Sequence, residues 1–258
     1  MATPRARFEG RIKNVHVTQA PDKIATGDAL IITCEHGGRE VPPEYAHLFT
    51  DLKDLLETHR GWDPGALVLA QELALTFAAP LFTATTTRLL IDLNRSIGHK
   101  RLYSEATRAL PRAARGRIVT QHYRPYRAAV AAEVARQIAL GKRVTHIASH
   151  SFTPELGGVV RQADVAWLYN PKRAGEGVLA RQWQAALRSR RPDLKLRRNY
   201  PYEGKDDGQM LQLRRCHAPD QYLGLELEVN HRFAVAGGDA WTQLRADIIA
   251  SLADVRGL

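Results

Sequence analysis

Four short polar clusters in the chain each follow a run of apolar residues. The clusters are Glu35-His36, Asp92-Leu93-Asn94-Arg95, Ser149-His150-Ser151 and Glu228-Val229-Asn230-His231. Apolar runs of this length are typical of the buried strands of an α/β sheet, and ligands of such sheets gather beyond the carboxyl ends of the strands. We therefore expect the four clusters to meet at one edge of a sheet and to form a site there.

Two histidines in these clusters are candidate metal ligands. His36 lies between an apolar run and Gly37-Gly38, and His150 lies where the run 144–149 ends. Two neutral imidazoles and one carboxylate, with the fourth position open to water, are a common ligand set of catalytic zinc. A lone histidine is more often a hydrogen-bonded core or turn residue, so the prediction depends on the pair. The same donors also accept iron, cobalt or manganese.

The carboxylate of this ligand set has three candidates. Asp63 stands at the expected start of a helix, where an aspartate also serves as an N-cap. Glu35 and Glu40 flank His36 and compete with Asp63 as ligands. We favour Asp63. His146, on the same strand as His150, is expected to pack in the core or to support a ligand from behind.

Glu228 is the candidate general base. Glu226 and Glu228 are two residues apart in a strand-like run, so both point to the same side of the sheet. A buried strand tolerates a carboxylate poorly unless that carboxylate is paired or functional. At a site with an activated water, Glu228 would take a proton and pass it to a departing amine. The alternative is a surface pair on an edge strand.

Arginines of the chain are candidate anchors for an anionic substrate. The fork of Arg95 matches a carboxylate in bidentate fashion, and Asn94 precedes it. The alternative for Arg95 is a surface ion pair. Asp92 is expected to form a structural salt bridge rather than to orient Arg95. Arg161 is a further basic candidate near a glycine turn, although its context favours a surface position over a binding role.

Composition limits the class of protein. The chain has 258 residues, 44% of them hydrophobic, a net charge of +10 and 7% aromatic residues. The arginines are not interleaved with aromatic residues as stacking platforms for bases would require, so nucleic-acid binding is not expected. No apolar run is long enough to span a bilayer, and the first residues do not resemble a secretory signal. Two cysteines favour a reducing compartment, and we expect a cytoplasmic protein.

Strand-like and helix-like segments alternate along the chain. We predict strands over 29–34, 79–86, 88–91, 144–149, 165–169, 195–200 and 222–229, and helices over 64–77, 125–140, 173–190 and 239–254. This order predicts an α/β fold with a mostly parallel mixed sheet and helices on both faces. We expect a single domain over 1–258, with its core at about 28–256 and an N-terminal extension over 1–27. The sequence gives no indication of the oligomeric state.

The ordered set of motifs resembles the N-formylglutamate amidohydrolase family. The matching segments are CEHGG, VP, WDPGA, LLIDLNR, SHSF and YLGLELEVNHR, in this order from Ala29 to Arg232. The resemblance implies a three-layer fold similar to that of zinc carboxypeptidases and aspartoacylase-like deacylases. It also implies one Zn²⁺ per chain and a small anionic N-acyl amino acid as substrate, whose formyl or other small acyl group is removed by hydrolysis.

The resemblance also implies roles for individual residues. His36 matches the first zinc ligand, His150 the last, and Glu228 the glutamate that activates water. Asn94 and Arg95 match the pair that such deacylases use on the substrate carboxylate and the developing oxyanion. The remaining match, the loop from Asn199 to Gly204 with Tyr202, would line the pocket.

Two departures from the family pattern leave questions open. Position 39 is Arg39 and the glutamate falls at Glu40, so the pattern does not identify the second metal ligand. His231 stands where many members have arginine, which leaves the acyl group and the amino acid open. Alternatives in other classes are a carboxypeptidase-like peptide hydrolase, a metal-free hydrolase using Ser149 or Ser151, and a non-catalytic protein that binds anions or nucleic acid.

Overall fold

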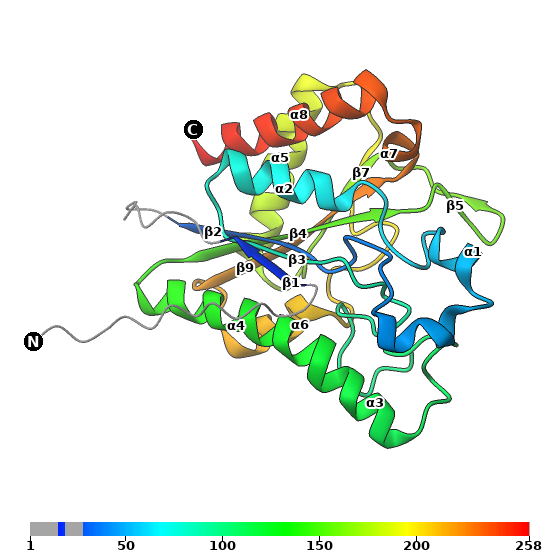
Figure 1. Ribbon diagram of the computed structural model, residues 1–258. Helices are drawn as coiled ribbons and strands as arrows, with labels where there is room; N and C mark the ends of the chain where they lie inside the picture. The colour runs from blue at the N-terminus through cyan, green and yellow to red at the C-terminus, as the bar shows by residue number, and fades with distance from the viewer. Residues whose placement is uncertain (1–14, 19–27, 258) are drawn as a thin grey trace, which may run out of the picture.

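A seven-stranded sheet lies between two layers of helices in the computed structural model, which describes residues 15–18 and 28–257 (Figure 1). The strand order is β1-β3-β2-β4-β9-β7-β8. The bounds are β1 Val15–Thr18, β2 Ala29–Cys34, β3 Leu81–Ala84, β4 Val144–Phe152, β7 Val165–Leu168, β8 Leu196–Arg198 and β9 Tyr222–Asn230. The central strands β3, β2, β4 and β9 are parallel, whereas β1 and the pair β7–β8 run the other way. The predicted mostly parallel mixed sheet is confirmed.

The two faces of the sheet are covered by different helices (Figure 1). One layer contains α2 (Ala66–Thr76), α5 (Ala174–Arg190) and α8 (Gly238–Arg256), and the other contains α4 (Arg124–Ala139) and α6 (Gln209–Cys216). Successive side chains of a strand point to opposite faces. Ile32, Ile147 and Leu225 accordingly pack with the first layer, and Ile31 and Val144 pack with the second.

Shorter elements surround the edge of the sheet at which the parallel strands end. They are η1 (Pro43–Phe49), α1 (Lys53–Leu56), α3 (Arg112–Ile118), the π-helical turn η2 (Val119–Tyr123), α7 (Arg232–Ala236) and the hairpin of β5 (Glu155–Leu156) with β6 (Val159–Val160). The helix predicted over 125–140 therefore begins earlier, because α3 and η2 run directly into α4. Within the described ranges, no helix is long and apolar enough to cross a membrane.

The prediction of a strand over 88–91 is wrong. The segment forms a turn, in which the backbone N–H of Leu90 donates to the carbonyl of Thr87 at 3.0 Å. Leu90 and Ile91 are apolar because they pack in the core beneath α4, where they are 0% and 2% exposed. An apolar run alone therefore indicated burial and not backbone conformation.

Three other predictions need adjustment. The strand predicted over 195–200 is confined to β8, and helix α6 was not predicted. The interval expected as an N-terminal extension contributes β1, which pairs antiparallel with β3. The rest of that interval, 1–14 and 19–27, lies outside the described residues.

A buried charge cluster fastens α5 and α6 to the sheet. The Glu176 side chain is fully buried and accepts hydrogen bonds from Arg214 Nε at 2.9 Å, Gly224 N at 3.1 Å and Asn170 N at 2.9 Å. Arg173 Nε lies 3.3 Å from the same carboxylate. Removing the charge of one member of such a buried group is strongly destabilising, because its partners are left uncompensated.

Glu176→Gln is expected to lower the free energy of unfolding by about 3 to 5 kcal/mol, because Arg173 and Arg214 would remain buried without a counter-ion. Urea denaturation followed by circular dichroism measures this change. Glu44→Gln, at an exposed position of η1, is the matched control and should be nearly neutral. Equal stability of the two variants would contradict a structural role of the cluster.

Candidate active site

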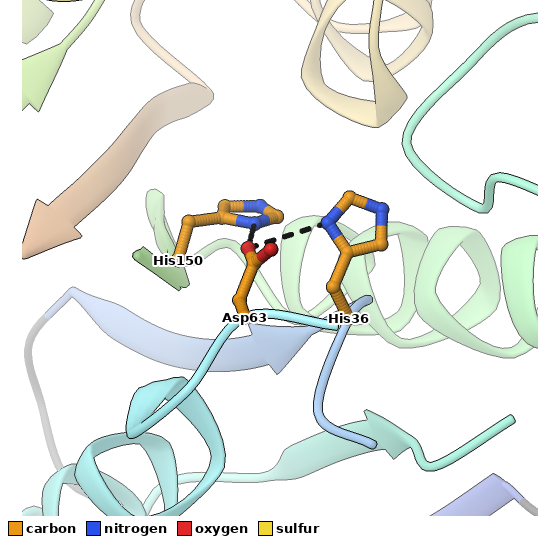
Figure 2. Close-up of side chains that lie close together, drawn as sticks. All are labelled: His36, Asp63 and His150. Carbon is orange, nitrogen blue, oxygen red and sulfur yellow. Dashed lines mark hydrogen bonds and ion pairs between the residues drawn. The ribbon is translucent and has the colours of Figure 1, made fainter. Parts of the chain in front are cut away.

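His36, Asp63 and His150 form a buried group at the edge where the parallel strands end (Figure 2). His36 lies two residues beyond β2, and His150 lies in the neighbouring strand β4. Asp63 is joined to this edge by its backbone N–H, which donates to the carbonyl of His36 at 2.9 Å. One atom of each side chain lies within 4.8 Å of the others, and no residue of the three is more than 4% exposed.

The inner nitrogens of both imidazoles face one carboxylate oxygen. Asp63 Oδ2 lies 3.4 Å from His36 Nδ1 and 2.9 Å from His150 Nδ1 (Figure 2). The sequence left Asp63, Glu35 and Glu40 open as the carboxylate of this group. Asp63 is the one that the structure brings to both histidines, while Glu40 is exposed and accepts a hydrogen bond from Thr85.

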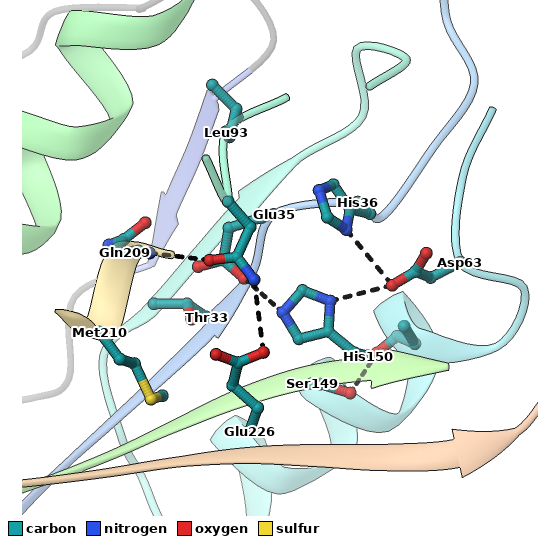
Figure 3. A network of polar contacts seen from close by, with 12 residues as sticks. Thr33, Glu35, His36, Asp63, Leu93, Ser149, His150, Gln209, Met210 and Glu226 are labelled. Carbon is teal, nitrogen blue, oxygen red and sulfur yellow. Dashed lines mark hydrogen bonds and ion pairs between the residues drawn. The ribbon is translucent and has the colours of Figure 1, made fainter. Parts of the chain in front are cut away.

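A carboxylate stands behind each imidazole. His36 Nε2 lies 2.8 Å from Asp92 Oδ1. His150 Nε2 lies 3.2 Å from Glu35 Oε2 in an ion pair, and Figure 3 shows these two residues side by side. The Tyr126 hydroxyl donates to the other Glu35 oxygen at 3.1 Å. Ionised carboxylates only accept, so a neutral ring can donate to one of its two carboxylate neighbours and not to both, and metal binding at Nδ1 requires the proton on Nε2. Each ring then presents the lone pair of its Nδ1 to Asp63.

This arrangement fits a metal ion. Two nitrogen lone pairs and one carboxylate oxygen face one another in a buried space, and they need a cation between them. A proton takes this place when no metal does. Burial lowers the pKa of His150, but the hydrogen bonds and charges of Asp63 and Glu35 outweigh burial and raise that pKa well above its ordinary value.

Arg88 connects the two aspartates of the site. Its Nη1 lies 3.2 Å from Asp63 Oδ1 and its Nη2 lies 2.8 Å from Asp92 Oδ2. Burial raises the pKa of Asp92, yet the charges of Arg88 and His36 prevail and hold it well below its usual range. Sequence reasoning missed Arg88 because the residue stood at the start of a supposed strand. Its spacing of four residues from Asp92 was the available signal.

Glu228 lies beside this group. It pairs with His150 in the ladder of β4 and β9, so both side chains point to the same face of the sheet. The residue is 5% exposed, and its Oε2 has no hydrogen-bond partner among the described residues. Burial above all, with the charges of Asp63 and Glu226, raises the pKa of Glu228 to about 8. A carboxyl group with an unpartnered oxygen and a raised pKa, close to the candidate metal ligands His36, Asp63 and His150, is suited to proton transfer.

Asn94 and Arg95 reach the site edge through the turn that carries Asp92. The Asn94 Oδ1 accepts from the backbone N–H of Gln209 at 2.8 Å, and its amide donates to Glu226 at 3.4 Å. Arg95 Nη1 donates to the carbonyls of Asn94 at 3.0 Å and Asp207 at 2.8 Å. Arg95 Nε is buried and, within the described residues, unpartnered.

In the loop after β8, Asn199 is held by hydrogen bonds within the protein, whereas Tyr202 is exposed. Asn199 adopts a φ of 47°, and its Oδ1 accepts from Tyr169 N at 2.9 Å and Gly204 N at 3.2 Å, so it shapes the loop. Tyr202 is 44% exposed and stacks with the guanidinium of Arg161 at 5.1 Å. Contact of these residues with a substrate stays a prediction.

The serine hydrolase alternative finds no matching geometry. Both ring nitrogens of His150 face carboxylates, so neither is free to take a serine proton. Ser149 Oγ donates to the carbonyl of Ala66 at 2.9 Å. No described serine side chain is hydrogen-bonded to His150.

A family model described as N-formylglutamate amidohydrolase matches residues 28–234. The chain belongs to the N-formylglutamate amidohydrolase family. The resemblance that the ordered motifs suggested is thereby confirmed, and the family places the protein among amidohydrolases.

Solved structures agree in fold. The gene product Atu2144 from Agrobacterium tumefaciens is 28% identical, with a TM-score of 0.76 over 95% of this chain and 96% of that one. N-formylglutamate amidohydrolase from Ralstonia eutropha JMP134 is 19% identical, with a TM-score of 0.65 over 95% of this chain and 99% of that one. Among curated proteins, none is significantly similar to the chain.

Proposed function

We propose that the chain is a zinc-dependent deacylase that hydrolyses the N-formyl or other small N-acyl amide of an acidic or related amino acid. The observation that carries the proposal is the convergence of two imidazole nitrogens on Asp63, each ring held by a carboxylate behind it. Carboxylates behind metal-binding histidines fix the tautomer and orient the ring. Membership of an amidohydrolase family supports the same reaction class.

His36, Asp63 and His150 are the residues that would hold the ion, one per chain. Zinc in such a site supplies Lewis acidity, which makes water a nucleophile near neutral pH and polarises an amide carbonyl. Three protein ligands leave a fourth position for the reactants. Arg88 orients Asp63 by its hydrogen bond to Oδ1. Burial raises the pKa of Asp63, but the two histidines, to whose effect the charge of Arg88 adds, hold that pKa below its usual range.

Glu228 moves the proton in this proposal. In its ionised form, Glu228 accepts the proton of the attacking water at its unpartnered Oε2 and then delivers this proton to the nitrogen of the leaving amine; a pKa raised to about 8 makes the ionised carboxylate a stronger base. The free Nε–H of Arg95 is the proposed donor to the oxygen of the tetrahedral species, while its Nη1 fixes the guanidinium on two backbone carbonyls. Asn94, which precedes Arg95 in the chain, is proposed to contact the substrate next to Arg95.

The compartment we propose is the cytoplasm. Cys34 and Cys216 are both free, and Cys34 is buried in the core. Free thiols fit a reducing environment, in which no disulfide is needed.

Purified protein is expected to contain about one zinc per chain and to hydrolyse N-formyl-L-glutamate. Chelation should lower the rate at least about 100-fold, because a site of three protein ligands loses its Lewis acid, and added zinc should restore the rate. Mass spectrometry gives the metal content, and chelator preloaded with zinc is the control. Full turnover by demonstrably metal-free protein would overturn the proposal.

A further inference from the structure

Arg161 is brought to the site by the β5–β6 hairpin. The hairpin follows β4, the strand of His150, and extends from the site edge of the sheet (Figure 1). The backbone N–H of Arg161 donates to the carbonyl of Pro154 at 2.7 Å and closes the hairpin. The guanidinium then lies over the rings of Phe152 at 6.0 Å and Tyr202 at 5.1 Å. Phe152 is two residues beyond His150 in β4. The stacked guanidinium of Arg161 therefore lies at the same end of this strand as the group of His36, Asp63 and His150.

Arg88 and Arg95, two other arginines at this edge, already have partners. Arg88 is bound to Asp63 and Asp92, and Arg95 Nη1 is bound to two backbone carbonyls. Arg161 has one long hydrogen bond, from Nη1 to the carbonyl of Thr153 at 3.4 Å. No carboxylate of the described residues lies within ion-pair distance of it. The fork of Arg161 is therefore the one that remains able to take a carboxylate in bidentate fashion.

Two half-buried histidines add to the positive character beside Arg161. Burial first, and then the charges of Arg161 and Arg88, lower the pKa of His59. Burial first, then the charge of His59 and also that of Arg161, lower the pKa of His231. The charge of Asp63 raises the pKa of both imidazoles, which indicates that His59 and His231 lie near Asp63. An anion entering here meets one permanent cation and two imidazoles that can donate.

Arg95 and Arg161 contact different residues of the loop between β8 and α6, Asp207 and Tyr202. Arg95 contacts Asp207 in the loop before α6, and α6 packs in the α4 layer. Arg161 acts on His231 at the start of α7, whose Phe233 and Ala234 pack with the layer of α2 and α8.

We propose that Arg161 binds the side-chain carboxylate of the substrate and so makes the enzyme selective for N-acyl amino acids with two carboxylates. The inference rests on the proposed function, which it deepens by naming the residue that selects the substrate class. Tyr202 and Phe152 hold the guanidinium flat, while His59 and His231 favour the second negative charge.

The test compares N-formyl-L-glutamate with N-formyl-L-glutamine, which lacks the side-chain charge. Arg161→Gln is expected to lower kcat/KM about 10- to 100-fold for the glutamate compound, the range of one hydrogen-bonded charge, and less than about threefold for the glutamine compound. Lys172→Gln is the matched loss of one positive charge. Lys172 is exposed and follows β7, which runs antiparallel to β9 and ends away from the site edge. Lys172→Gln should leave kcat/KM unchanged for both compounds.

A binding measurement separates this inference from the proposed function. Calorimetry with glutarate, a five-carbon dicarboxylate, is expected to give a Kd at least about tenfold higher for Arg161→Gln than for the unaltered protein. Equal glutarate affinity, or equal losses for both formyl substrates, would overturn the role of Arg161 even if deacylation is established. Glutarate binding that depends on Arg161 in a protein that hydrolyses neither compound would support the carboxylate site and reject the deacylase.

Discussion

Glu228→Gln is expected to lower kcat about 10²- to 10⁴-fold while zinc remains bound at about one per chain. The carboxyl pairs with His150 across β4 and β9 and has a buried oxygen without a partner among the described residues, so it can carry a proton and is not one of the three proposed metal ligands. Glutamine keeps the shape and cannot carry the proton. Steady-state rates with N-formyl-L-glutamate and the zinc content of the same samples measure both parts.

The stability of the metal-free variant shows whether the environment of Glu228 is as described. Because burial raises the pKa of Glu228 to about 8, the folded protein holds this proton and the unfolded chain releases it above the ordinary pKa. Folding stability is therefore lost as the pH rises between the ordinary value and about 8. Glutamine removes this loss, so the variant should gain a few kcal/mol over the parent at about pH 8 and much less at about pH 4.

Three outcomes would count against the role of Glu228. They are retained turnover, loss of zinc, and a stability difference that does not change with pH. Glu44→Gln, an exposed carboxylate of η1, is the control for the loss of one negative charge and should leave turnover and its pH dependence unchanged.

The central strands could be predicted because the apolar residues that form each of them are consecutive in the sequence. Residues 29–34, 144–149 and 222–229 are apolar runs that end in polar residues, and all three are strands of the parallel part of the sheet. Since parallel strands end at one edge, the meeting of His36, His150 and Glu228 follows from this pattern. The edge strands were less well bounded, because β8 has only one buried residue, Leu196.

The supporting residues of the site could not be predicted because they depend on contacts distant in sequence. The sequence favoured Asp63 over Glu35 and Glu40 as the carboxylate of the group but left all three open, and the fold brings Asp63 to both histidines. Arg88 was hidden because the apolar residues after it pack in the core as a turn and not as a strand. Glu35 was expected to compete for the metal, whereas it supports His150 from behind.

Asp63→Asn and Asp92→Asn are expected to weaken zinc binding to different degrees. Asp63 Oδ2 is the only carboxylate oxygen of the described residues that contacts the inner nitrogens of both His36 and His150. Its replacement should leave two histidines, too few for a stable site, so zinc and turnover are lost together. Asp92 contacts the outer nitrogen of His36 instead, and loss of such support typically lowers metal affinity about 10- to 100-fold.

Competition titrations with a zinc-binding dye give both affinities. Which of the two variants binds zinc more weakly is more informative than either affinity alone. Asp63 faces the inner nitrogen of His36 as a ligand, whereas Asp92 faces the outer nitrogen of the same ring as its support. High zinc concentrations should restore most of the turnover of Asp92→Asn and little of that of Asp63→Asn, since only the first keeps all three ligands. If zinc rescued both variants alike, Asp63 would not be a ligand, and the third ligand would have to be sought among the remaining carboxylates, with Glu35 and Glu228 as the nearest to His150.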